Sequence, residues 1–236
     1  MRDTLRPDDR IVWDEYVQLE VDGVRREAVG ALQRFVDRLK SYSEDERRRF
    51  ALLLVDAVRR EGGSEFPIRH PLWNEVVLPV LLERYDRNEP GSARSLLRFR
   101  HQLHGGSACA EQIGDRDVSD WALVDQAITQ EPNARDLRER WLAMRADWFE
   151  YAIHEVPSGV LLGQDGASVA GCDDLLAELS EFEVRAEALG VRDQHGEAIR
   201  EWRYYFAGYR EYLVHSEDYA SFADFLSSHP MSAERT

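Results

Sequence analysis

Apolar residues recur every three or four positions along most of the chain, the spacing that places side chains on one face of an α-helix. The three clearest stripes are Leu137, Trp141, Met144, Trp148 and Tyr151; Cys172, Leu175, Leu179, Phe182, Ala186 and Leu189; and Ile199, Trp202, Phe206, Tyr209 and Leu213. Because a lone amphipathic helix does not stay folded in water, each stripe requires a facing helix. We expect Trp141 and Trp148 to be buried against the helix that carries Trp202.

The N-terminal half shows the same spacing, with helix start and stop signals between the stripes. One stripe, which ends near Lys40, consists of Ala28, Leu32, Phe35 and Leu39. Ser43 and Glu46 have the spacing of a capping box, which opens a helix. Helices are predicted over 43–60, 72–87, 90–104, 120–130, 133–154 and 216–226. Pro79 falls inside the second of these and is expected to kink or split it.

Strand signals are almost absent. Residues 17–21 alternate between apolar and polar, but the residues after Asp22 and Gly23 do not, so we predict helix there as well. The predicted fold class is therefore all-α, with antiparallel helix pairs that form a short α-solenoid or an irregular helical bundle. We expect a single all-helical domain over 1–230, with a possible subdivision near 105–118, and a disordered tail at 231–236.

Two short segments of the chain resemble each other. Residues 89–94 and 131–135 each open a helix with glutamate and proline, and the two prolines are 42 residues apart. Ala127, five residues before Pro132, resembles the end of a tetratricopeptide-type repeat. The resemblance covers only Ala127–Pro132, and the Trp, Gly-Tyr and Ala-Phe positions of the repeat are not matched. It implies helix pairs stacked as a solenoid.

The charge is distributed unevenly along the chain. Residues 1–100 carry 19 Lys+Arg and 19 Asp+Glu, whereas residues 101–236 carry 11 and 26, so the formal net charge of −15 lies in the second part. An acidic surface repels the phosphates of nucleic acid and of anionic membranes, so we expect neither as a partner. It would attract a basic protein and speed its association at low salt. Alternatively, the acidity only keeps the protein soluble.

The sequence lacks the local signatures of several common protein classes. No apolar run approaches 18 residues, and residues 1–22 hold no signal-peptide core, so we expect a cytoplasmic protein without a membrane span. Two cysteines, Cys109 and Cys172, are too few for a disulfide framework or a zinc ribbon. The glycine-rich nucleotide-binding motifs and the Gly-x-Ser-x-Gly elbow are also absent, and we expect no cofactor.

The candidate binding residues are four acidic side chains on a helix predicted to start near Ser168: Asp173, Asp174, Glu178 and Glu181. The last three are spaced by four and three residues and form a ridge beside the apolar stripe, with no basic residue on the helix to neutralise it. We expect this ridge to be a docking surface. Alternatively, the acids are a solvated helix N-terminus.

A metal site is the other interpretation of these acids. Asp173, Asp174 and Glu178 resemble the aspartate-rich helix of isoprenoid-processing enzymes, which implies carboxylate-bound magnesium. The second metal motif of that class is missing. A second group of residues that commonly bind metal consists of His101, His104 and Cys109. It lacks the further ligand that a metal site needs, and the two histidines are also favourable in the last turn of a helix, where the dipole attracts positive charge. We therefore predict no metal ion.

Two other segments have both a functional and a structural interpretation. The loop around Gly159 and Gly163 is long for a compact helical domain and could be the lid of a ligand-sensing bundle, unless its Val160–Leu162 triplet packs into the core. Tyr204, with Arg203 and Arg210, could form an interaction patch, since Tyr and Arg are enriched at binding hot spots. Ordinary surface is the alternative.

The sequence thus favours a non-enzymatic helical protein that binds a basic partner protein through an acidic C-terminal surface. In bacteria, such a protein would be an adaptor or an immunity-type neutraliser of a basic toxin. The alternatives are a helical enzyme with a carboxylate-bound divalent metal and a ligand-sensing helical bundle.

Overall fold

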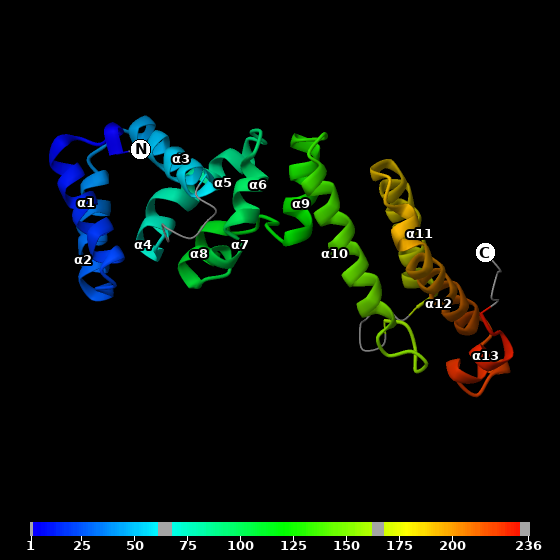
Figure 1. The fold of residues 1–236 in the computed structure, drawn as a ribbon. Helices are drawn as coiled ribbons and strands as arrows, with labels where there is room; N and C mark the ends of the chain where they lie inside the picture. Colours follow the sequence, from blue (N-terminus) through cyan, green and yellow to red (C-terminus); the bar gives the residue numbers. More distant parts are fainter. Residues whose placement is uncertain (1, 61–67, 162–167, 232–236) are drawn as a thin grey trace. The chain divides into compact units, whose positions relative to one another are not determined.

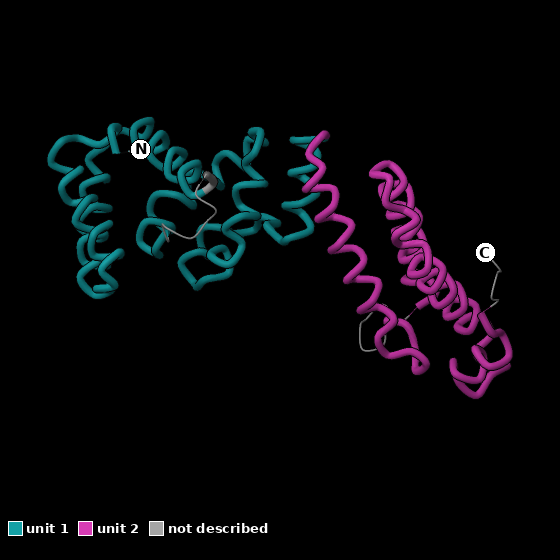
Figure 2. The backbone as a smooth tube through the Cα atoms, in the orientation of Figure 1, with its two compact units in different colours: residues 1–132 teal, residues 133–236 magenta. Residues whose placement is uncertain are grey.

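The structure, a computed structural model, describes residues 2–60, 68–161 and 168–231. These residues are mostly helical and include no β-strand (Figure 1), which confirms the all-α fold class. The chain divides into two compact units, Met1–Pro132 and Asn133–Thr236 (Figure 2). The division falls outside the 105–118 segment suggested by the sequence. A single domain over 1–230 stays a prediction, and 232–236 of the expected tail lie outside the described residues.

The first unit consists of helices packed in neighbouring pairs. A short turn, η1 (Arg2–Thr4), precedes α1 (Pro7–Val21), which packs on α2 (Arg25–Leu39). Next, α3 (Glu44–Arg60) faces a helix in three parts, α4 (His70–Leu72), η2 (Trp73–Val77) and α5 (Leu78–Asp86). The unit is completed by α6 (Ser92–Arg98), α7 (Arg100–Leu103), α8 (Ser107–Ile113) and α9 (Asp120–Gln130), with α6 packed on α9.

The signals predicted around α2 and α3 are confirmed. All four residues of the stripe that ends near Lys40 are buried. In the capping box, the Ser43 N–H donates to Glu46 Oε2 at 2.8 Å, and the Glu46 N–H donates to Ser43 Oγ at 3.3 Å. The bond from the Ser43 N–H, which favours the charged carboxylate, lowers the pKa of Glu46. The box therefore fixes the start of α3.

Pro79 splits its helix, as predicted. The residues before it form a π-helix, η2, whose wider turn accommodates the proline ring. Pro79 has no N–H to donate to the Asn74 carbonyl five residues earlier, and the Gln112 side chain donates to that carbonyl at 3.0 Å instead. The Cys109 thiol lies 3.2 Å from Asn74 Oδ1. Asn74 thus anchors α8 on the broken helix.

The helix predicted over 90–104 is shorter and interrupted. Gly91 has a φ of +74°, so α6 begins only at Ser92. At Phe99 the backbone leaves the α-helical region, and its N–H donates to the Leu96 carbonyl three residues earlier, which separates α6 from α7. The following helix, α8, was not predicted.

The second unit contains three long helices and a short one. They are α10 (Arg135–Ile153), α11 (Val169–Leu189), α12 (Gly196–Val214) and α13 (Phe222–Ser228), with turns η3 (Arg192–His195) and η4 (Ser216–Asp218) around α12. Helix α11 packs on both α10 and α12, and α13 packs on α12. The helix predicted over 216–226 is thus a turn followed by α13. Helix α13 begins after Ser221, and the Ser221 hydroxyl caps it by accepting a hydrogen bond from the Asp224 N–H.

The stripes of α11 and α12 are buried except for their last residues, Leu189 and Leu213, which are half-buried, whereas α10 turns a different face to the core than its predicted stripe. Trp141 is buried, as expected, whereas Trp148 is half-buried and stacks on the exposed Tyr151. Phe149 is buried instead, with its ring centroid 5.1 Å from that of Trp202 and 5.6 Å from that of Phe206. The prediction for Trp148 is wrong because α10 has apolar residues at adjacent positions, and spacing alone does not select between them.

No helix in the described ranges has the length and apolar character needed to cross a lipid bilayer.

Candidate functional site

The predicted acidic ridge on α11 is largely neutralised by arginines of the same unit. Glu178 pairs with Arg145 of α10 at 2.6 Å, and Glu181 pairs with Arg185 of its own helix at 2.6 Å. The expectation that no basic residue of the helix neutralises the ridge is therefore wrong. Glutamate followed by arginine four residues later is a favourable helical pair.

These two ion pairs enclose a buried tryptophan. The guanidinium of Arg185 lies 4.0 Å from the ring centroid of Trp141, and that of Arg145 lies 5.2 Å from it. Trp141 is only 1% exposed and the Arg145 side chain 15%, so the Arg145 contact is largely shielded from water, which strengthens cation–π attraction, whereas the Arg185 side chain is 34% exposed. Glu178 and Glu181 hold the two guanidinium groups in place. This set of five residues, the Trp141 cluster, joins α10 to α11, so its two acids stabilise the fold.

The other two ridge candidates differ from each other. Asp173 pairs with Arg210 of α12, so Arg210 is not part of a patch with Tyr204. Asp174 is exposed, and no ion-pair partner lies near it in the described ranges. The structure therefore leaves Asp174 as the ridge residue open to a partner. The unit nevertheless keeps its acidity, because residues 133–236 contain 20 Asp and Glu against 10 arginines.

The candidate metal ligands do not converge. In the described ranges, no three His, Cys, Asp or Glu side chains are placed to hold a metal ion. His101 and His104 are exposed, while the buried Cys109 thiol lies within hydrogen-bond distance of two acceptors, Asn74 Oδ1 and the Gln102 carbonyl. Burial raises the pKa of the Cys172 thiol to about 11, which keeps it protonated. The metal-enzyme alternative thus has no three-ligand site among the described residues.

The described part of the α10–α11 loop is anchored in the core. Gly159, Val160 and Leu161 are all buried, and the Leu161 N–H donates to the Ala152 carbonyl at 2.9 Å. Gly163 lies outside the described residues. Gly159 and its two neighbours pack as core and do not form a movable lid.

A groove on the second unit runs between α12 and α13, with a volume of about 420 Å³. It is lined by Arg200, Arg203, Tyr204, Ala207, Gly208, Glu211, Phe225, His229 and Met231. The lining is mostly apolar, with charged groups at the rim. This combination and volume are typical of sites that bind an apolar group in a defined orientation.

Two small residues of α12 line the groove. A Cβ atom on Gly208 would lie 3.5 Å from the Phe225 ring, an ordinary van der Waals distance, so α13 packs directly beside this position. Ala207, beside it, leaves open space on the exposed side. The Tyr204 hydroxyl donates to the His229 carbonyl at 2.6 Å and closes one wall. Tyr204 and Arg203 were predicted from the sequence, but Ala207 and Gly208 were not. Two small residues side by side in a helix rich in aromatic residues were the available signal.

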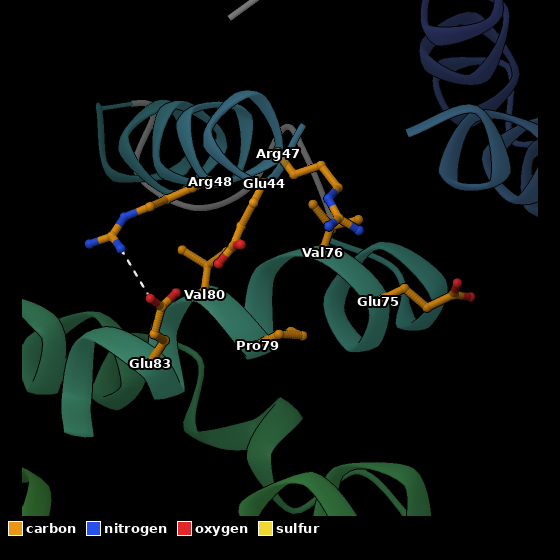
Figure 3. A pocket seen from close by; sticks show the side chains of 8 residues that line it. All are labelled: Glu44, Arg47, Arg48, Glu75, Val76, Pro79, Val80 and Glu83. Carbon is orange, nitrogen blue, oxygen red and sulfur yellow. Dashed lines mark hydrogen bonds and ion pairs between the residues drawn. The ribbon is translucent and has the colours of Figure 1, made fainter. Parts of the chain in front are cut away.

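A smaller pocket lies in the first unit, between α3 and the η2–α5 segment, with a volume of about 190 Å³ (Figure 3). Its lining consists of Glu44, Arg47, Arg48, Glu75, Val76, Pro79, Val80 and Glu83. Val76, Pro79 and Val80 are its apolar residues, and they belong to the segment split by the proline. The pocket was not predicted, although Pro79 marked the irregular segment that forms it.

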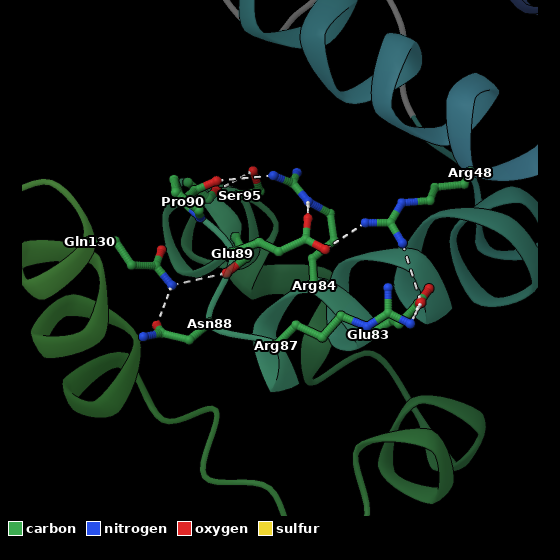
Figure 4. Close-up of polar contacts among 11 residues, drawn as sticks. Arg48, Glu83, Arg84, Arg87, Asn88, Glu89, Pro90, Ser95 and Gln130 are labelled. Atoms are coloured by element: carbon green, nitrogen blue, oxygen red, sulfur yellow. Dashed lines mark hydrogen bonds and ion pairs between the residues drawn. The ribbon is translucent and has the colours of Figure 1, made fainter. Parts of the chain in front are cut away.

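Two lining residues of this pocket, Arg48 and Glu83, belong to an ion-pair network (Figure 4). Arg48 pairs with Glu83 at 3.3 Å and with Glu89 at 2.6 Å, while Arg84 donates to Glu89 at 2.8 Å. The hydrogen bonds from Arg84 and then Arg48 lower the pKa of Glu89. The network joins α3 to the end of α5, so these charges hold the two walls together.

The chain matches no protein-family model, no curated protein and no solved structure.

Proposed function

We propose that this protein is a non-enzymatic binding protein that engages a basic segment of a partner protein through its second unit. The partner would place one large apolar side chain in the α12–α13 groove and surround it with basic residues. Such a role suits an adaptor or a neutraliser of a basic protein. The observation that carries the proposal is the groove itself, an apolar hollow on the more acidic of the two units.

The chemistry of the groove supports an apolar anchor. Ala207, Gly208 and Phe225 provide the apolar contact area, and burial of one large side chain there would contribute about 1.5–3 kcal/mol. Tyr204 and Arg203 lie at its rim, and both residue types are common at binding hot spots.

The net charge of the second unit supports a basic partner, although the groove itself is lined by two arginines, Arg200 and Arg203, and one glutamate, Glu211. Arg203 pairs with Glu183, so its charge is balanced within the unit. Glu211 and Arg200 are exposed at the rim, without ion-pair partners in the described ranges. The excess of acidic residues in 133–236 would attract a basic segment over distances of about a Debye length, ~10 Å at 0.1 M salt.

Selection from a displayed peptide library tests this proposal on the full-length protein. The variant Ala207→Phe fills the groove from an exposed position and should leave the fold intact, and it takes no part in the selection. We expect the selected peptides to share one large apolar residue flanked by Lys or Arg. We also expect their affinity to fall about tenfold or more on Ala207→Phe, which is equivalent to about 1.4 kcal/mol.

The matched control is Ala188→Phe, at an exposed position of α11 outside the groove. It should bind the selected peptides as the unmodified protein does. Enrichment of acidic peptides, or equal loss of affinity in both variants, would refute the groove as the binding site.

A further inference from the structure

We propose that the pocket between α3 and the η2–α5 segment binds a free α-amino acid with a branched aliphatic side chain. The inference does not depend on the proposed function, because the pocket lies within the first unit and the groove within the second. It follows from which charged groups of the pocket are already paired and which are not.

Most charged groups of the pocket are neutralised by neighbouring side chains. Arg48 and Glu83 pair with each other, as described above. Glu75 pairs with Lys40 at 3.2 Å, and Figure 3 shows its side chain directed away from the pocket. None of these three residues needs a ligand to balance its charge.

Two lining residues of opposite charge remain. Glu44 and Arg47 lie three positions apart on α3, and neither has an ion-pair partner within the described part of the chain, not even the other. In Figure 3, Glu44 reaches from α3 toward Val80, and Arg47 reaches toward Val76. The pocket thus presents one free anion and one free cation over apolar side chains.

This arrangement matches the groups of a zwitterionic amino acid. A guanidinium binds a carboxylate with two parallel hydrogen bonds, so Arg47 would hold the ligand carboxylate. Glu44 would accept hydrogen bonds from the ammonium group, and an aliphatic side chain would contact Val76, Pro79 and Val80. A ligand with a single charge would engage only one of these two side chains, Glu44 or Arg47.

The volume of the pocket limits the size of the ligand. About 190 Å³ is below the ~300–1,000 Å³ of sites for drug-sized molecules, and it suits a molecule as small as leucine, isoleucine or valine. Val76 belongs to the η2 π-helix, and Pro79 contributes an apolar ring to the same wall of the pocket. The irregular segment therefore supplies the apolar surface of the pocket.

Methyl NMR titration of the full-length protein with L-leucine tests the inference. We expect saturable shifts of the Val76 and Val80 methyl signals. Three analogues of leucine each lack one group that the pocket is proposed to bind: 4-methylpentanoate lacks the amine, 3-methylbutylamine lacks the carboxylate, and glycine lacks the side chain. Each should bind about tenfold or more weakly, because a charge-assisted hydrogen bond or a buried side chain is lost.

Two substitutions assign the charged groups, and one control lies on the same helix. Arg47→Gln and Glu44→Gln should each weaken leucine binding about tenfold or more. Arg49→Gln changes an exposed arginine that does not line the pocket, and it should leave the affinity unchanged. Absence of saturable shifts with leucine, or equal affinity for leucine and 4-methylpentanoate, would overturn the proposal.

Discussion

Truncation of Phe149 should be among the most destabilising single changes in the second unit. Its ring is fully buried and packs on the rings of Phe182, Trp202 and Phe206 at centroid distances of 5.9, 5.1 and 5.6 Å. Phe149→Ala removes this aromatic contact area and leaves a cavity between three long helices. Phenylalanine-to-alanine changes in well-packed cores cost about 3–5 kcal/mol. We expect a value in this range, because helices that carry several large rings cannot easily close the cavity.

The matched control is the neighbouring residue, Trp148, which is larger but half-buried. Trp148→Ala loses its stacking on Tyr151, and we expect it to cost about 1 kcal/mol. Urea unfolding followed by far-ultraviolet circular dichroism would measure both changes, with the slope m compared to confirm that the same surface is exposed. An equal or larger effect of Trp148→Ala would refute the placement of Phe149 in the core.

Three further changes test the charged contacts and a helix cap. Glu178→Lys should destabilise the protein by about 2–3 kcal/mol because it places a second cation beside Arg145, whereas Asp174→Lys should stay within about 0.5 kcal/mol in the same unfolding assay. The pKa of Glu89 is lower in the folded state than its ordinary value of about 4.3. Ionised Glu89 therefore stabilises the folded protein above this ordinary pKa, and that contribution is lost as the pH falls through the folded-state pKa. The stability difference between the protein and Glu89→Gln should therefore be largest at neutral pH and shrink below about pH 4 in unfolding curves measured across this range. Ser43→Ala should cost about 1 kcal/mol through loss of the α3 cap, measured in the same way.

Helices with a single apolar face were the most predictable part of the fold. On α11 and α12 the apolar residues follow one spacing, and the predicted faces are the buried ones. On α10, adjacent pairs such as Trp148 and Phe149 are both apolar, so the buried face depends on which neighbour packs against it. The interruption at Phe99 arises from local backbone geometry that no start or stop signal in the sequence marks.

The candidate sites depended on contacts between residues far apart in the chain. Glu178 and Arg145 are separated by 33 positions, and their pairing converts a predicted docking ridge into a helix–helix contact. The groove requires Phe225 of α13 to pack beside Gly208 of α12. The charge imbalance could be predicted from the sequence because it requires no knowledge of packing. Which acidic residues form ion pairs and which stay unpaired could be distinguished only with the structure.

The most direct test of binding at the groove is the association rate constant of a selected basic peptide at low ionic strength. Glu211→Arg and Arg200→Glu reverse opposite charges at the two rim positions that have no ion-pair partner in the described ranges. Because rim charges act mainly on association, Glu211→Arg should slow it severalfold and Arg200→Glu should speed it, and both effects should fade at high salt. Unchanged rate constants, or a change of the same sign in both variants, would contradict binding of a basic partner in the α12–α13 groove.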